Sequence, residues 1–282
     1  MPPACSPRLV RLNIVLMAEP ELISVVMPTY NHAAFIGGAI GSVLNQTYSN
    51  FELIIVDNYS GDNTEAVVTA CGDSRIRYVK FLNKGIIAAA RNYGIRLARG
   101  EYVAFLDSDD LWMPEKLELQ MDSFNRVGDT ALVYSRFSTI TGDAVSEQVL
   151  PKIQRCLSGA IFRALYLRHF IACSGVMARR NILEHAGGFD EAPAMVAAED
   201  ADLWLKIALT GRVQCASDRS LFLYRVHTAN LSQGYFKRYK RAVMLARKYY
   251  IYAGFWSFVT AVALASGSII KQKLANIFRW PA

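Results

Sequence analysis

Four oxygen-bearing side chains in a row, Asp107-Ser108-Asp109-Asp110, directly follow the apolar segment 102–106. Carboxylates crowded at the end of a buried strand repel one another, and a hard divalent cation that bridges them to a phosphate relieves the repulsion. A solvent-exposed turn is the alternative, because Asp and Ser are common turn formers. The choice depends on whether other polar groups converge on this cluster.

The first third of the chain alternates short apolar runs with stretches of helical spacing. The expected strands are 23–27, 51–56, 76–81 and 102–106, and the expected helices are 33–44, 64–70 and 87–98. This alternation predicts βαβ units and a mainly parallel sheet, whose ligands bind beyond the carboxyl ends of the strands. Pro28-Thr29-Tyr30 and Asp57-Asn58 follow two of these strands. We therefore expect them to lie beside the acidic cluster, which favours metal-assisted chemistry on a phosphorylated ligand.

The second half of the chain is less regular. The expected helices are 160–170, 180–186 and 199–209, and the expected strands are 172–178, 213–216 and 221–226. We expect this half to shape the site of a second substrate.

Composition limits the class of protein. At 282 residues, 52% of them hydrophobic, the chain is long enough for one sizeable α/β domain without bulk disorder. The net charge of +7 is compatible with nucleic acid, an anionic membrane or a phosphorylated substrate, but the basic residues cluster late, at 236–248. That clustering favours a local surface role, and we expect no nucleic-acid partner.

Five scattered cysteines without CxxC spacing indicate neither a disulfide framework nor a zinc site, as is typical of a reducing compartment.

Two terminal segments lie outside the expected domain. Residues 1–20 form an N-terminal extension, within which Met17 is a candidate start. The tail 233–282 combines the basic cluster with an uncharged stretch, 249–270, that is long enough to cross a bilayer but contains Gly and Ser. An amphipathic or partly buried helix is an equal alternative. Because the basic residues suit anionic headgroups, we expect peripheral attachment of a cytoplasmic protein to the inner face of the cell membrane.

Five motifs follow one another along the chain: V-V-M-P-T-Y-N at 25–31, I-V-D-N at 55–58, A-R-N-Y-G at 90–94, L-D-S-D-D at 106–110 and E-D-A-D-L-W at 199–204. In this order they resemble the motifs of the inverting family-2 nucleotide-sugar glycosyltransferases. Each motif is weak alone, whereas their joint order is highly specific. The resemblance implies a GT-A fold, with a Rossmann-like, mostly parallel sheet flanked by helices. It divides a domain at 21–232 into a nucleotide-binding half, 21–112, and a smaller mixed acceptor half, 113–232, followed by a helical tail.

The resemblance also implies a nucleoside-diphosphate sugar donor, by family frequency a UDP-sugar. Its donor-binding residues would be Pro28, Thr29, Tyr30, Asp57, Asn58, Arg91, Asp107, Ser108 and Asp109. In this assignment Asp57 accepts a hydrogen bond from the base, for which a uracil N–H is suited. Tyr30 offers a flat face to the base, and Arg91 steadies the nucleotide.

Metal binding is implied by the same resemblance. An Asp-x-Asp motif in this family holds Mg²⁺ or Mn²⁺ against the donor diphosphate, and Asp109 would be that ligand. His227 would complete the coordination, with a surface histidine as the alternative. Hard carboxylate oxygens suit these ions, which neutralise the charge that builds on the departing nucleoside diphosphate.

Inversion requires a carboxylate on the acceptor side of the sugar that takes the proton of the attacking hydroxyl. The resemblance implies that Asp200 is this general base. Glu199 and Asp202 are alternatives, because carboxylates in the first turn of a helix are also stabilised by the helix dipole. Only the resemblance separates the three.

The predicted reaction is sugar transfer to a hydroxyl of a sugar or lipid-linked sugar acceptor, in cell-surface polysaccharide or glycolipid synthesis. A phosphohydrolase with Asp107 as nucleophile and an inactive sugar-nucleotide-binding protein of the same fold are the alternatives. A Rossmann oxidoreductase is disfavoured, because no GxGxxG follows the first strand.

Overall fold

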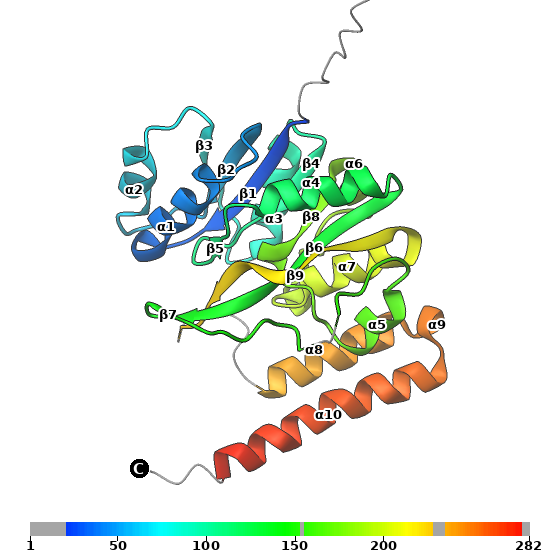
Figure 1. Cartoon of the computed structure of the whole chain (residues 1–282). Helices are drawn as coiled ribbons and strands as arrows, with labels where there is room; N and C mark the ends of the chain where they lie inside the picture. Colours follow the sequence, from blue (N-terminus) through cyan, green and yellow to red (C-terminus); the bar gives the residue numbers. More distant parts are fainter. Residues whose placement is uncertain (1–20, 153–154, 228–234, 278–282) are drawn as a thin grey trace, which may run out of the picture.

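The computed structural model describes residues 21–152, 155–227 and 235–277, and Figure 1 shows their arrangement. In the first half, parallel strands alternate with helices: β1 (Ile23–Thr29), α1 (Ala33–Leu44), β2 (Phe51–Asp57), α2 (Thr64–Ala70), β3 (Ile76–Lys80), α3 (Ile87–Leu97) and β4 (Tyr102–Phe105). The strands β1, β2 and β4 are fully buried runs of apolar residues with few polar ones, as expected for a parallel sheet covered on both faces.

The second half extends the same sheet. Its elements are β5 (Leu111–Trp112), α4 (Lys116–Arg126), β6 (Thr130–Thr141), β7 (Ala144–Val145), α5 (Phe162–Leu167), the 3₁₀ turn η1 (Cys173–Gly175), β8 (Met177–Arg179), α6 (Arg180–His185), the 3₁₀ turn η2 (Pro193–Met195), α7 (Glu199–Thr210) and β9 (Arg212–Arg225). The strand order is β3-β2-β1-β4-β8-β6-β9-β5, and β7 pairs with β6. Because β8 runs antiparallel to both β4 and β6, it joins the parallel first half to the mixed second half.

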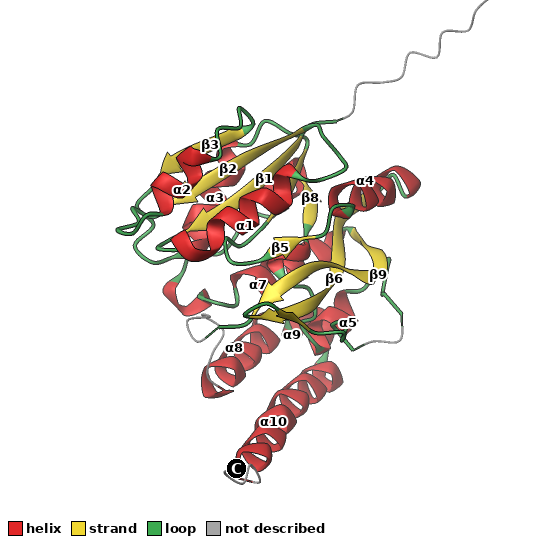
Figure 2. Ribbon diagram, turned by 60° about the vertical axis from the view of Figure 1, so that its left-hand side comes forward, coloured by secondary structure: helices red, strands yellow, loops and turns green. Residues whose placement is uncertain are grey.

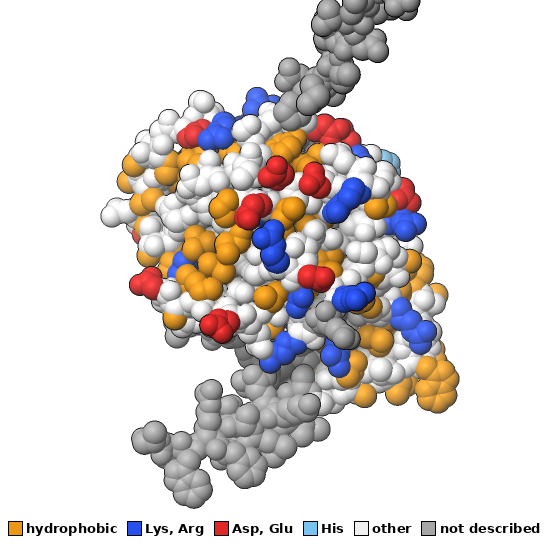
Figure 3. All heavy atoms as spheres, viewed as in Figure 1, with side chains coloured by type: hydrophobic (Ala, Val, Ile, Leu, Met, Phe, Trp, Pro, Cys, Tyr) orange, Lys and Arg blue, Asp and Glu red, His pale blue; other side chains and the backbone are white. Residues whose placement is uncertain are grey.

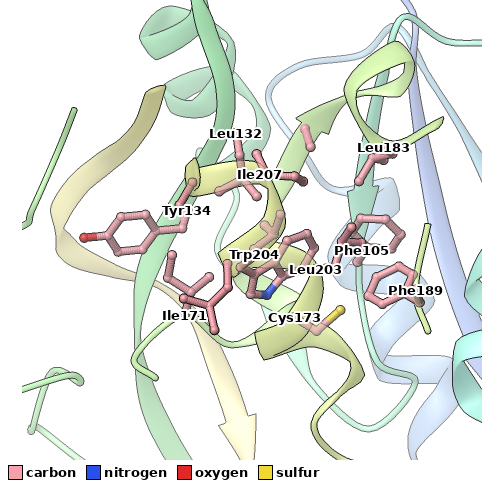
Figure 4. Close-up of a cluster of buried hydrophobic side chains, with 14 of the residues drawn as sticks. Phe105, Leu132, Tyr134, Ile171, Cys173, Leu183, Phe189, Leu203, Trp204 and Ile207 are labelled. Carbon is pink, nitrogen blue, oxygen red and sulfur yellow. The ribbon is translucent and has the colours of Figure 1, made fainter. Parts of the chain in front are cut away.

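Alternate residues of each central strand pack on opposite faces of the sheet. Val26 and Phe105 belong to a core that includes α3, α5 and α7, whereas Val25 and Ala104 belong to a core with α1 and α4. The period of two along a strand produces this division. Figure 4 shows part of the first core, in which the ring of Trp204 from α7 lies near Phe105. The same packing fixes α7 against the end of β4.

The predicted mainly parallel α/β fold is confirmed, and the boundaries in its first half agree within one or two residues. Two predictions in the second half were wrong. The separate strands 213–216 and 221–226 are one strand, β9, which continues through the polar residues between them and pairs with β6 on both sides of a register shift. The segment 172–178 begins as the turn η1 rather than as a strand, and only its end pairs in β8. The elements α4 and β6 were not predicted.

The tail forms three helices, α8 (Tyr235–Lys248), α9 (Tyr250–Ala253) and α10 (Phe255–Ile277), with α10 beside α8 below the sheet (Figure 1). Gly254, at φ +81°, separates α9 from α10, so the uncharged stretch 249–270 is not one continuous helix. Among the described residues, no helix combines the length and the apolar character needed to cross a membrane. The extension 1–20 and the expected domain boundary at 232 lie outside the described residues.

The expectation of unpaired cysteines was wrong for one pair. Cys156 and Cys215 form a disulfide, with their Cα atoms 5.7 Å apart. The segment before α5 runs back along β9, where Gly159 pairs with Val213, and this brings together two cysteines 59 positions apart. Such a long-range approach is not visible in cysteine spacing. Cys71 and Cys173 are free.

Close packing between α3 and β1 predicts a strict requirement for Gly94. A Cβ atom there would lie 2.3 Å from Val26 Cγ1, whereas a Cβ on Gly41 of α1 would meet nothing within 4 Å. We expect Gly94→Ala to lower the free energy of unfolding by about 1–3 kcal/mol, because the core must shift. Gly41→Ala should leave it unchanged or raise it by up to about 1 kcal/mol. Urea denaturation measures both; equal effects of the two variants would contradict the packing argument.

Candidate active site

The carboxyl ends of the parallel strands meet at one edge of the sheet, where the arrowheads of β1, β2 and β3 point the same way in Figure 2. Several hydrogen bonds join the segments that follow β1 and β2, and Asn31 makes two of them. Asn31 N donates to Ser60 Oγ at 2.8 Å, and Gly61 N donates to Asn31 Oδ1 at 2.8 Å. Asn31 and Tyr59 have φ near +55°, a strained conformation that accumulates at functional sites. The edge is therefore a preformed site of closely connected loops.

Asp57 lies completely buried at the end of β2. Its Oδ2 accepts a hydrogen bond from Tyr78 at 2.6 Å, and its carboxylate also accepts from the backbone and side chain of Ser60. These contacts hold the carboxylate in one orientation. Asn58 Oδ1 accepts the N–H of Asn83 at 2.9 Å and ties the end of β2 to the loop after β3.

Residues at the end of β1 lie at the same edge. Pro28 and Thr29 are buried, and Thr29 Oγ1 is a buried hydroxyl without a hydrogen-bond partner. The side chain of Tyr30 is 54% exposed. The edge thus combines an unsatisfied polar atom with an exposed aromatic ring; the nucleotide-binding roles of these residues stay predictions.

The acidic cluster divides into groups with different surroundings. Asp110 is buried, accepting a hydrogen bond from Ser174 Oγ at 2.6 Å and another from Arg225 N at 2.8 Å. Burial, and then the charges of Asp109 and Asp107, raise the pKa of Asp110 well above its usual range. Ser174 Oγ also accepts the N–H of Asp107 at 3.1 Å. Asp110 therefore helps to shape the turn, and the ligand-binding roles of Asp107 and Asp109 stay predictions.

Asp109 and His227 meet across the site. His227 Nε2 lies 2.8 Å from Asp109 Oδ2, and the two side chains are 19% and 13% exposed. Phe35 of α1 stacks on the His227 ring at 5.3 Å and fixes its plane. Ser108 Oγ lies 2.7 Å from His32 Nδ1. The structure thus brings together the predicted Ser108, Asp109 and His227.

A metal ion suits the donor atoms of Asp109 and His227. A carboxylate oxygen and an imidazole nitrogen are ligands for Mn²⁺, and the carboxylate suits Mg²⁺, which takes one or two carboxylates plus phosphate and water oxygens. In the part of the chain that the structure describes, no group of three or more His, Cys, Asp or Glu is arranged to hold a metal alone. An ion here would therefore need further oxygens from a bound phosphate or from water.

Arg91 connects the acidic turn to the start of α7. Its guanidinium is 4% exposed, donating from Nη2 to Asp107 at 2.7 Å and from Nη1 to Glu199 at 2.8 Å. Burial alone would lower the pKa of Arg91, but Asp107 and Glu199 outweigh it and raise the pKa well above its usual range. An arginine on a helix usually faces solvent. The structure instead places Arg91 inside the protein, between the two halves of the site.

The three carboxylates in the first turn of α7 have different partners. Glu199 pairs with Arg91, and Asp202 accepts hydrogen bonds from Lys248 at 2.8 Å and Tyr249 at 2.9 Å. Asp200 has no ion-pair partner among the described residues. Burial, and then the neighbouring charge of Glu199, raise its pKa to about 6. Asp200 is therefore the carboxylate of this turn best suited to accept a proton near neutral pH.

The positions missed by sequence analysis are His32, Phe35 and Ser174. His32 and Phe35 follow β1 at the edge of the sheet where the other site residues were expected. Their position in the sequence, directly after the first strand, is the signal that could have identified them. Ser174 lies 64 positions from Asp110. Nothing in its local sequence indicates that contact.

Comparison with known proteins identifies the family. The model of glycosyl transferase family 2 matches residues 24–187, more than half of the chain. The chain belongs to glycosyltransferase family 2. One member, the Escherichia coli protein WfgD, named as a UDP-Glc:α-D-GlcNAc-diphosphoundecaprenol β-1,3-glucosyltransferase, is 32% identical over 79% of this chain and 84% of its own length. TuaG of Bacillus subtilis, a putative teichuronic acid biosynthesis glycosyltransferase, is 30% identical over 80% of this chain and 88% of its own length.

Solved structures confirm the GT-A type of fold. Staphylococcus aureus TarS (residues 1–349), in complex with UDP-GlcNAc, superposes with a TM-score of 0.66 at 20% identity, over 81% of this chain and 66% of that one, just under two thirds. The mannosyltransferase PcManGT of Pyrobaculum calidifontis, in complex with GDP-Man and Mn²⁺, has a TM-score of 0.64 at 19% identity, over 93% and 82%. At these identities the likeness concerns the fold. The family-2 chain is a glycosyltransferase, as its motifs predicted.

The buried guanidinium predicts a large effect of removing Arg91. We expect Arg91→Met to lower the free energy of unfolding by about 3–5 kcal/mol, because Glu199 would remain as an uncompensated buried charge. Arg96→Met, on the exposed side of the same helix, removes only a contact with Tyr93 and should cost less than about 1 kcal/mol. Urea denaturation compares the two. Similar losses would show that the buried pairs do not hold the site together.

Proposed function

We propose that this glycosyltransferase moves a sugar, with inversion, from a UDP-sugar to a hydroxyl of a lipid-linked sugar. The observation that carries the proposal is the state of Asp200, the one first-turn carboxylate of α7 without a cation partner in the described structure and with a pKa of about 6. A general base is most effective when its pKa lies close to the working pH. Asp200 takes the hydroxyl proton, the acceptor oxygen attacks the anomeric carbon, and the bond to the diphosphate breaks.

The donor site consists of the loops after β1, β2 and β4. Asp57, held by Tyr78 and Ser60, accepts a hydrogen bond from the base, while Pro28, Thr29, Tyr30 and Asn58 surround the nucleoside. Asp107 and Ser108 contact the ribose and diphosphate. Because the Arg91 side chain is only 4% exposed and donates to Asp107 and Glu199, we assign it the role of positioning Asp107 rather than of touching the nucleotide. The names of WfgD and of the TarS complex support a UDP-sugar.

Asp109 and His227 would hold Mg²⁺ or Mn²⁺ with the donor diphosphate. When bound, this ion supplies positive charge that stabilises the departing nucleoside diphosphate. The 2.8 Å approach of the two side chains and the Mn²⁺ complex of PcManGT support this assignment. Phe35 keeps the imidazole in plane, and Ser108, bonded to His32, keeps the turn in place.

The acceptor is proposed from the relatives. WfgD is named for a diphosphoundecaprenol-linked substrate, and TuaG for a cell-wall polymer. A lipid-linked acceptor places the enzyme at the cytoplasmic face of the cell membrane, in cell-surface polysaccharide or glycolipid synthesis. The basic helical tail is the segment proposed to contact that membrane.

Separate variants test the base and the metal ligand. Asp200→Asn should bind UDP with Mn²⁺ as the unaltered enzyme does and lose at least about 100-fold in the rate of transfer, because no group takes the proton. Asp109→Ala should weaken the metal-dependent binding of UDP itself. Asp122→Asn, an exposed carboxylate on α4, serves as the matched control and should change neither. Calorimetry and donor-turnover assays give both readouts; full transfer by Asp200→Asn would overturn the assignment of the base.

The pKa of Asp200 also predicts a pH dependence. A base must be ionised, so kcat/KM should be constant above about pH 7 and fall about tenfold for each pH unit below about 6. The sign follows from the raised pKa, since protons bind Asp200 as the pH falls through 6. The residual rate of Asp200→Asn should lack this limb. A flat wild-type profile between about pH 5 and 8 would exclude Asp200 as the base.

A further inference from the structure

The outward face of the helical tail is apolar and aromatic. Ile251, Tyr252, Phe255, Trp256 and Val259 form an exposed surface, here called the apolar edge; Ile251 is 85% and Trp256 76% exposed. The opposite side of α10 packs against α8 and α5. In Figure 3 hydrophobic side chains gather at the lower right, over the junction of α9 and α10, with Lys and Arg side chains nearby. A surface helix normally turns its polar face outward, so this edge lacks a partner in the described structure.

The charge of the tail is strongly one-sided. Residues 233–282 contain nine Lys and Arg and no Asp or Glu, so residues 1–232 carry a net charge of −2 within the total of +7. Lys237, Lys240 and Arg247 are exposed on α8. Two copies of such a tail placed face to face would repel each other. An anionic surface would attract it.

The tail is also fixed to the enzyme. Tyr249 is buried and donates to the backbone and side-chain oxygens of Asp202 on α7, the helix that carries Asp200. Lys248 reaches Asp202 at 2.8 Å and Asp190 at 3.2 Å. The apolar edge, two residues further along, is therefore held at a defined place relative to the active site.

We infer that the apolar edge inserts into the interface of a bilayer that contains anionic lipids, while the basic residues of the tail contact the headgroups. Trp, Tyr and Phe are the side chains that favour the level of the headgroups, and apolar burial together with basic charge gives stable binding. The inference deepens the proposed function, since it rests on a lipid-linked acceptor for its purpose. It adds which residues enter the membrane and that α7 is oriented towards it.

Vesicle binding by the full chain tests the inference. The probe is co-sedimentation with vesicles of phosphatidylglycerol and phosphatidylcholine, and with phosphatidylcholine alone. We expect Ile251→Ser combined with Trp256→Ser to weaken binding to the anionic vesicles at least about tenfold without lowering the melting temperature, because both side chains are exposed. Leu82→Ser, which removes an exposed apolar side chain near the end of β3, should bind as the unaltered chain does.

Three outcomes would overturn the inference. The first is equal vesicle binding by the double variant and the unaltered chain. If high salt then abolished the binding of both proteins equally, the contact would depend on charge alone. Another is loss of a dimer in the double variant with no vesicle binding by either protein, which would assign the edge to a second copy. The third is equal weakening by Leu82→Ser. Vesicle binding requires no sugar transfer, so failure of the proposed function would leave this result interpretable.

Discussion

The buried guanidinium of Arg91 is the contact on which the arrangement of the site depends. It lies between Asp107, at the end of β4, and Glu199, at the start of α7, two elements from different halves of the chain. Buried ion pairs add little net stability, because desolvation offsets their attraction, but they strongly penalise arrangements in which one partner is missing. Arg91 therefore selects one relative position of the donor turn and the helix that carries Asp200.

Repulsion between like charges explains the arrangement of the acidic turn. Its three carboxylates cannot all be charged and exposed to one another at a strand end. Asp110 is buried and its pKa rises, while Ser174 and the backbone of Arg225 satisfy its oxygens. The raised pKa favours the uncharged form of Asp110, which lowers the electrostatic repulsion around Asp107 and Asp109. One carboxylate of the cluster thus stabilises the loop, whereas Asp107 pairs with Arg91 and Asp109 lies beside His227.

The sequence predicted the fold of the first half well because its signals are local. The apolar strands β1, β2 and β4 are each followed by polar residues. Because parallel strands end at the same edge of a sheet, Asp57 and the acidic turn had to lie at one edge. Arg91 was harder, because helical position alone assigns an arginine to the surface and its partner Glu199 is 108 positions away. Ser174 and the Cys156–Cys215 pair were invisible for the same reason. In the strands β6 and β9 polar residues interrupt short apolar runs, so β6 was not predicted and β9 was predicted as two strands.

Glu199, Asp200 and Asp202 show how the structure separates residues that sequence could not distinguish. Glu199 attaches α7 to the donor half through Arg91, and Asp202 attaches it to the tail through Lys248 and Tyr249. Each of these carboxylates is paired with a cation. Asp200 lies between them and has no ion-pair partner among the described residues, and burial, followed by the negative charge of Glu199, raises its pKa. The chemistry of this residue is therefore a product of the docking of α7 on both sides, and the tail belongs to the architecture of the active site.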